Sequence, residues 1–268
     1  MSAEQTAREV ARSDAMKRLA RLGFAARATV YLLIGWFTVL LALGKPRPEA
    51  DQRGALQEVT RHRGGYALLL VIAIGLAGYA LWRFAEAAFG VVGEGRKTGP
   101  RIQSFARGCI YAFFAVTAVS ILLHSRRSSQ ARQQEFLTAS VMRHSWGRVL
   151  VGIVGAVIMV IGAVLVVEGL TRKFKKYFAL DDMPPATRRV VWILGTFGTA
   201  ARGIAFGLTG FFVLRAAWQY DPSKAGGLDA ALRTVAESST GRALVACVAV
   251  GLIAFGLYGY AEAMWRRT

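Results

Sequence analysis

The sequence predicts an all-α integral membrane protein with six transmembrane helices, arranged as three parallel two-helix repeats in a pseudo-threefold arrangement. Of its 268 residues 54% are hydrophobic, and the mean hydropathy is +0.38 despite 34 lysines and arginines. This combination is unusual for a soluble domain. The apolar residues are gathered into stretches near the roughly 20 residues that cross a bilayer. An arginine and a glutamate also recur three times in register, which indicates a repeated unit.

The predicted helices follow from the apolar stretches in chain order. Five of these stretches are uninterrupted. A sixth span is required between Val190 and Trp218, where Arg202 and Arg215 interrupt the hydrophobic run. The repeat register places this span, the fifth in chain order, at about residues 199–218. The five uninterrupted stretches lie at residues 28–44, 64–82, 108–125, 149–167 and 243–261.

The register rests on a glycine that opens the second helix of each repeat. A glutamate follows this glycine by 21 positions in every copy, and an arginine precedes it by 38, 40 and 39 positions. Only the connecting loop therefore varies in length. The three sets, each given as arginine, glycine and glutamate, are Arg27, Gly65 and Glu86; Arg107, Gly147 and Glu168; and Arg202, Gly241 and Glu262.

This register divides the chain into five segments. They are a cytoplasmic amphipathic arm at 1–21, repeat 1 at 22–90, repeat 2 at 100–171, a basic cytoplasmic linker at 172–190 and repeat 3 at 195–268.

Small and aromatic residues accompany each arginine in the same order. Small residues permit close approach of helices in lipid. The matching segments are Ala26-Arg27-Ala28 with Tyr31 and Gly35, Ala106-Arg107-Gly108 with Tyr111, and Ala201-Arg202-Gly203 with Gly210, together with Gly75-Leu76 through Glu86-Ala87 and Gly251-Leu252 through Glu262-Ala263.

Through these segments the chain resembles the family called domain of unknown function 1206, bacterial integral membrane proteins with three tandem two-helix units. The likeness covers about residues 22–265. The middle unit departs most, because Ala115 and Val157 stand where the other units have glycine. The family implies the architecture and no known reaction.

The distribution of basic residues predicts the orientation. Six spans put both termini on one side, and that side carries sixteen basic residues against eleven in the opposite loops. The positive-inside rule therefore predicts a multi-pass protein of the bacterial plasma (inner) membrane with both termini in the cytoplasm. The charged N-terminal segment lacks the short apolar core of a cleaved signal, so it is expected to be retained.

The six repeated charges are the first candidate site. Each arginine is expected to begin its first helix and each glutamate to lie near the end of its second. All six then share a layer near the cytoplasmic face, where each arginine meets a glutamate of its own unit or of the next. Three roles remain open: structural staples that set helix pairing, a ring that gates or lines a central path, and snorkelling contacts with lipid headgroups.

A basic segment after the fourth span is the second candidate site. Arg172, Lys173, Lys175 and Lys176 alternate with aromatic residues, as suits an interfacial segment. Membrane lipids, in particular anionic ones, are the expected partners, through plain anchoring or through specific recognition. The net charge of +18 is assigned to span flanks and not to nucleic-acid binding. A homo-oligomer or another membrane partner stays open.

Three functional classes remain. The favoured one is a structural, assembly or lipid-interacting helical bundle with Arg–Glu staples. The alternative is a small transporter or channel with a charged ring on the cytoplasmic side, and an intramembrane enzyme is third. No catalytic residue, cofactor or metal is predicted, since His62 and His144 supply at most half a metal site.

Overall fold

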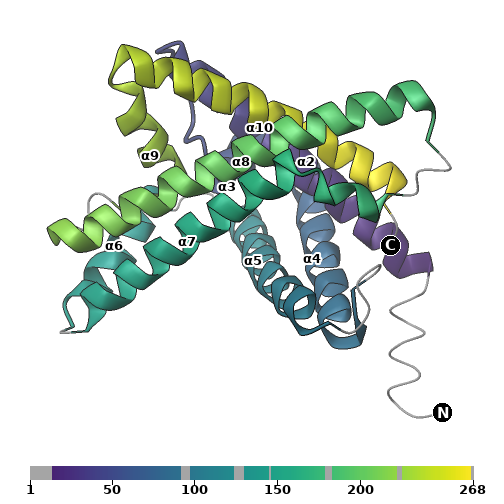
Figure 1. Cartoon of the computed structure of the whole chain (residues 1–268), viewed down its shortest axis with the longest axis horizontal. Coiled ribbons are helices and arrows are strands. Elements are labelled where there is room, and N and C mark those ends of the chain that lie inside the picture. The colour runs from purple at the N-terminus through teal and green to yellow at the C-terminus, as the bar shows by residue number, and fades with distance from the viewer. Residues whose placement is uncertain are drawn as a thin grey trace.

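The structure is a computed structural model, and it describes residues 14–91, 97–123, 130–144, 146–178, 183–221 and 225–266. This part of the chain is helical, and six of its helices are long and apolar enough to cross a membrane. The protein is therefore a multi-pass membrane protein. The six spans are α2 (Asp14–Ala42), α4 (Gly65–Phe89), α5 (Thr98–Leu123), α7 (Gly147–Leu170), α8 (Pro185–Gln219) and α10 (Ser239–Trp265) (Figure 1).

Several helices extend well beyond their apolar stretches. α8 begins at Pro185, fourteen residues before the expected start, so residues 185–190 of the expected linker are helical. α2 begins at Asp14 and takes in residues 14–21 of the expected arm, whose first thirteen residues lie outside the described part. Hydropathy marks the part of a helix that lies in lipid, whereas backbone hydrogen bonding continues into polar sequence.

Within each repeat the two spans are joined by a short helix, where the sequence predicted a loop. These helices are α3 (Gln52–Val59), α6 (Gln130–Met142) and α9 (Gly227–Ala236). The repeated glycine follows each of them, and a β-carbon at that position would overlap the carbonyl oxygen of the residue six positions earlier. The overlapping pairs are Gly65 with Val59, Gly147 with Val141, and Gly241 with Val235. The glycine is thus repeated because the chain must fold back against its own backbone.

The second span of each repeat packs most extensively against the first span of the next. α4 lies beside α5, α7 beside α8, and α10 beside α2, which closes the series from repeat 3 back to repeat 1 (Figure 1). The small residue after each arginine lies at these contacts. Ala28 faces Gly256 on α10, and Gly203 faces Gly162 on α7. The three repeats therefore form a pseudo-threefold arrangement.

The ring is interrupted in repeat 2. Within repeats 1 and 3 the two spans also pack on each other, α2 on α4 and α8 on α10. Gly75 and Gly251 meet Ala26 and Ala201 at these junctions. Among the described residues of repeat 2, α5 and α7 barely touch. Val157, which replaces that glycine, is 52% exposed.

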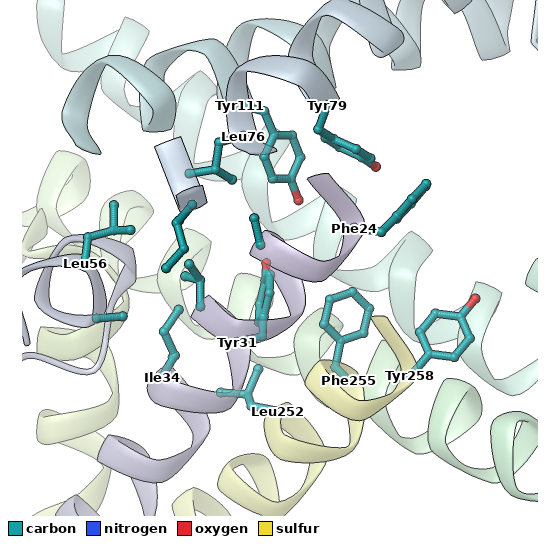
Figure 2. Packing of buried hydrophobic residues seen from close by; sticks show 14 of the residues in the cluster. Phe24, Tyr31, Ile34, Leu56, Leu76, Tyr79, Tyr111, Leu252, Phe255 and Tyr258 are labelled. Carbon is teal, nitrogen blue, oxygen red and sulfur yellow. The ribbon is translucent and has the colours of Figure 1, made fainter. Parts of the chain in front are cut away.

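The termini side of the bundle is the side on which α2 begins and α10 ends. Arg266, just after α10, lies over the ring of Phe24 in α2, at 5.0 Å from its centroid. The short helices α3, α6 and α9 lie at the opposite ends of the spans, which we call the far side. An aromatic cluster fills the centre, where Tyr79 and Tyr111 pack edge to face at 4.6 Å (Figure 2).

Candidate functional site

The charged layer consists of the six repeated charges, and the structure places its arginines inside helices. They lie 13, 9 and 17 residues after the first residues of α2, α5 and α8, or about 20, 14 and 26 Å along the helix axes. The expectation that each arginine begins its helix is therefore wrong. The glutamates do lie in the last turns of α4, α7 and α10. The arginines of the charged layer are Arg27, Arg107 and Arg202, and its glutamates are Glu86, Glu168 and Glu262.

One arginine and one glutamate of the layer form a buried ion pair. The guanidinium of Arg27 donates to one carboxylate oxygen of Glu262, and Arg266 donates to the other. Arg27 also donates to the hydroxyl of Tyr79 at 3.3 Å. Because Arg27 is in repeat 1 and Glu262 in repeat 3, this pair joins the two repeats that are most distant in sequence.

Glu86 takes a different partner. It accepts a 2.7 Å hydrogen bond from Arg83 on its own helix and a 3.0 Å hydrogen bond from Ser104 on α5. Arg83 donates in addition to the hydroxyl of Tyr79, at 2.6 and 3.0 Å. The sequence reading missed Arg83 and Arg266. Their spacing was the available signal, since Arg83 precedes Glu86 by three residues and Arg266 follows Glu262 by four, both on one helix face.

The surroundings of the remaining three members of the layer differ from those of Arg27, Glu86 and Glu262. Within the described residues, Arg107, Glu168 and Arg202 make neither a hydrogen bond nor an ion pair. Arg202 instead faces the rings of Tyr31, Phe206 and Phe255, with centroids at 5.5, 5.3 and 5.0 Å from its guanidinium carbon. Its buried Nε finds no hydrogen-bond acceptor among the described residues. The expectation that every arginine meets a repeated glutamate thus holds for Arg27 alone.

A polar pocket of about 100 Å³ lies among these charges. Its lining carries six cations, which are the three repeated arginines with Arg266, Lys173 and Lys176, and two carboxylates, Glu168 and Glu262. The volume suffices for several water molecules or one compact anion, since one water takes up about 30 Å³ of liquid. The excess of cations makes an anion the electrostatically favoured occupant.

The predicted basic segment forms one wall of this pocket. It folds as the short 3₁₀ helix η1 (Lys173–Tyr177), which follows directly after α7. Phe174 is buried and packs on the ring of Tyr258 at 5.3 Å. Lys175 lies 3.7 Å from the ring centroid of Trp192, and Arg172 is exposed. Lys173 and Lys176 line the pocket, so the two candidate sites of the sequence meet there in the structure.

Apolar residues of α3 cover the centre of the bundle on the far side of this layer. Between Arg27, Tyr31 and Tyr111 and this short helix lies a cavity of only about 20 Å³. Leu56 of α3 is buried at this place, and it lines the cavity together with Leu76 of α4; both side chains are labelled in Figure 2. The charged layer is therefore followed by a tightly packed, mostly apolar region.

Buried acidic groups on the far side tie repeat 1 to repeat 3. Asp229 accepts from Arg47 at 2.5 Å and from the backbone N–H of Ala50 at 2.7 Å. Asp51 caps α3 by accepting from the N–H of Gly54 at 2.8 Å. Burial, together with the nearby charges of Glu49 and Asp229, raises the pKa of Asp51 to about 7, although the hydrogen bond from Gly54 lowers it.

Comparison with known proteins supports the repeat architecture. The family described as Domain of Unknown Function (DUF1206) matches the chain three times, over residues 22–90, 102–172 and 197–266. The chain is also similar to a Bacillus subtilis (strain 168) protein described as "Uncharacterized protein YxxB", with 30% identity over 254 residues, which are 94% of this chain and 91% of the relative. No solved structure matches. The family resemblance found in the sequence is confirmed.

Proposed function

The chain belongs to the Domain of Unknown Function (DUF1206) family, and from this premise we propose a lipid-interacting helical bundle that holds an anionic group in its charged layer. We place it in the bacterial plasma membrane with both termini in the cytoplasm, on the excess of basic residues in the segments on that side. The observation that carries the proposal is the pocket, where six cations face two carboxylates.

Two of the cations have the strongest need for an anion. Arg107 and Arg202 lie in mid-helix and make no hydrogen bond or ion pair with the described residues. A charged side chain at such depth is costly unless it is paired. A guanidinium satisfies this need best with a planar or tetrahedral oxyanion, through two parallel hydrogen bonds. Arg27 and Glu262 act differently, as a staple between repeats 1 and 3.

A transporter or channel remains the alternative and has less support. It requires polar groups along the axis across the whole bilayer. Beyond Arg27, the described residues around the cavity of about 20 Å³ that follows the charged layer are mostly apolar or aromatic, such as Leu56 and Leu76, with Gln52 as the added polar side chain. Reconstituted vesicles test this alternative directly. An anion flux that is lost in Glu168→Gln favours transport. If the wild-type protein carries no anion flux, the lipid-interacting bundle is favoured.

The binding proposal is tested by the thermal unfolding of the purified protein in detergent with added lipid. Phosphatidylglycerol is expected to raise the unfolding midpoint by several degrees more than phosphatidylcholine does, because a ligand stabilises the state that binds it. The double variant Arg107→Gln/Arg202→Gln is expected to lose this difference.

Arg215→Gln is the matched control, because Arg215 is an exposed arginine on the same helix as Arg202. It is expected to keep the lipid-dependent difference. If this control loses the difference as fully as the double variant, general surface charge explains the stabilisation and the proposal fails.

A further inference from the structure

The interrupted side of the ring borders the pocket. Of the apolar windows of α5 and α7, only 28% and 22% of the residues are buried, against 56% in α2, α4 and α10. Both poorly buried helices contribute to the pocket lining, α5 through Gln103 and Arg107, and α7 through Leu165 and Glu168. The pocket therefore lies at the junction where neighbouring spans do not pack on each other.

The helix faces that continue from the pocket are apolar. Ile110 follows Arg107 by three residues and is 49% exposed, and Ile161 precedes Leu165 by four residues and is 44% exposed. Helical spacing of three or four residues puts each isoleucine on the same face as its partner at the pocket. The junction thus combines a cationic end with two apolar walls.

We infer that the anion is the phosphate group of a membrane phospholipid, which enters sideways between α5 and α7 and keeps its acyl chains against these two helices. This inference rests on the proposed function and adds the source of the anion. A phospholipid matches the junction because it has one anionic end and an apolar remainder. A dissolved anion is not stabilised by contact with the two apolar walls.

Charge argues against a second copy of the chain as the occupant. A second copy docked symmetrically at this junction would bring the same face, and with it Arg107, toward its counterpart. Two guanidinium groups brought together in a setting of low dielectric repel each other. A phospholipid brings the opposite charge to the same place.

Photolabelling in vesicles tests the route. The probes are phosphatidylglycerol and phosphatidylcholine that carry a diazirine in one acyl chain, and mass spectrometry maps the labelled residues. With the anionic probe, labelling around Ile110 and Ile161 is expected to exceed that with the zwitterionic probe several-fold. Arg107→Gln/Arg202→Gln is expected to remove this excess.

The groove between α8 and α10 supplies the internal control. It has a volume of about 420 Å³ and an apolar lining that includes Phe197 and Val250, which are exposed on the outer surface. Labelling there is expected to be the same for both probes and in both proteins. A headgroup effect of equal size at the two places would show nonspecific enrichment of anionic lipid and would overturn the inference.

Inorganic phosphate separates failure of the route from failure of the pocket. Inorganic phosphate could raise the unfolding midpoint through Arg107 and Arg202 while the labelling between α5 and α7 is the same for both lipid probes. In that case the pocket takes a dissolved anion and only the lateral route is wrong. If neither phosphatidylglycerol nor inorganic phosphate shifts the midpoint, the proposed function itself fails. If chemical crosslinking instead joins two copies through α5 and α7, the junction is a protein interface and the inference is wrong.

Discussion

At the residue scale, the six repeated charges have unequal surroundings. Arg27 and Glu262 are buried and paired, Glu86 takes Arg83, and Arg107, Glu168 and Arg202 make no ion pair with the described residues. The register of the sequence identified the six positions. It could not identify partners, because the rotation of each helix and the extra cations Arg83 and Arg266 decide them.

The buried pair predicts a large and non-additive effect on stability. Arg27→Gln is expected to lower the free energy of unfolding by about 3–5 kcal/mol, because Glu262 keeps a buried charge with only Arg266 beside it. Unfolding in denaturing detergent measures the change. Glu168→Gln is the control and is expected to have a much smaller effect, since that carboxylate makes no ion pair with the part of the chain that the structure describes.

A double-mutant cycle sharpens this test. Arg27→Gln/Glu262→Gln is expected to cost less than the sum of the two single variants, because each single variant leaves its partner uncompensated. Strict additivity would mean that the two side chains do not interact in the folded protein.

Asp51 predicts how stability depends on pH. Its pKa is about 7 in the folded protein and near 3.8 without burial. Between these values the folded state binds more protons than the unfolded state, so the contribution of this residue to stability falls as pH rises from about 4 to about 7. Asp51→Asn keeps the oxygen that caps α3 and cannot ionise.

Asp51→Asn is therefore expected to remove this fall in stability with rising pH and to be more stable than the wild type above pH 7. Unfolding midpoints across this pH range provide the measurement. Equal pH slopes for the two proteins would show that Asp51 does not titrate there.

At the scale of elements, glycine decides which spans pack within a repeat. Gly75 and Gly251 admit Ala26 and Ala201, whereas Val157 stands at the matching position of repeat 2 and α5 barely touches α7. Gly75→Val is expected to destabilise by about 1–3 kcal/mol, because its β-carbon would come within 2.8 Å of the Ala26 β-carbon. Gly251→Val is expected to behave in the same way.

Val157→Gly is the reciprocal control for these two variants. Val157 is half exposed, so we expect at most the roughly 1 kcal/mol that glycine costs inside a helix. Unfolding midpoints of the three variants test the assignment. A greater loss in Val157→Gly than in Gly75→Val would contradict it.

The elements were only partly predictable from the sequence. The apolar stretches identified five spans, and the repeat register found the sixth, α8, despite Arg202 and Arg215 within it. The start of α8 at Pro185 and the short helices α3, α6 and α9 were missed. Hydropathy reports contact with lipid, and these segments lie where the chain leaves lipid or covers the ends of the bundle.

At the scale of the whole molecule, the threefold repetition and its interruption in repeat 2 are two features of one arrangement. Parallel repeats predicted the pseudo-threefold arrangement, and the contacts of α4 with α5, α7 with α8 and α10 with α2 realise it. The sequence also contained a sign of the open junction, in Val157 of the middle repeat. Without the contacts, nothing indicated that this valine marks the place where α5 and α7 separate, or that Arg107 makes no ion pair with the described residues.

The central claim is that the charged layer holds an anionic phospholipid through the junction between α5 and α7. An experimental structure in nanodiscs that contain phosphatidylglycerol tests it most directly. We expect lipid density with its phosphate beside Arg107 and Arg202 and its acyl chains between α5 and α7. A structure with α5 packed on α7, Arg107 paired with Glu168 and no lipid at the junction would contradict it.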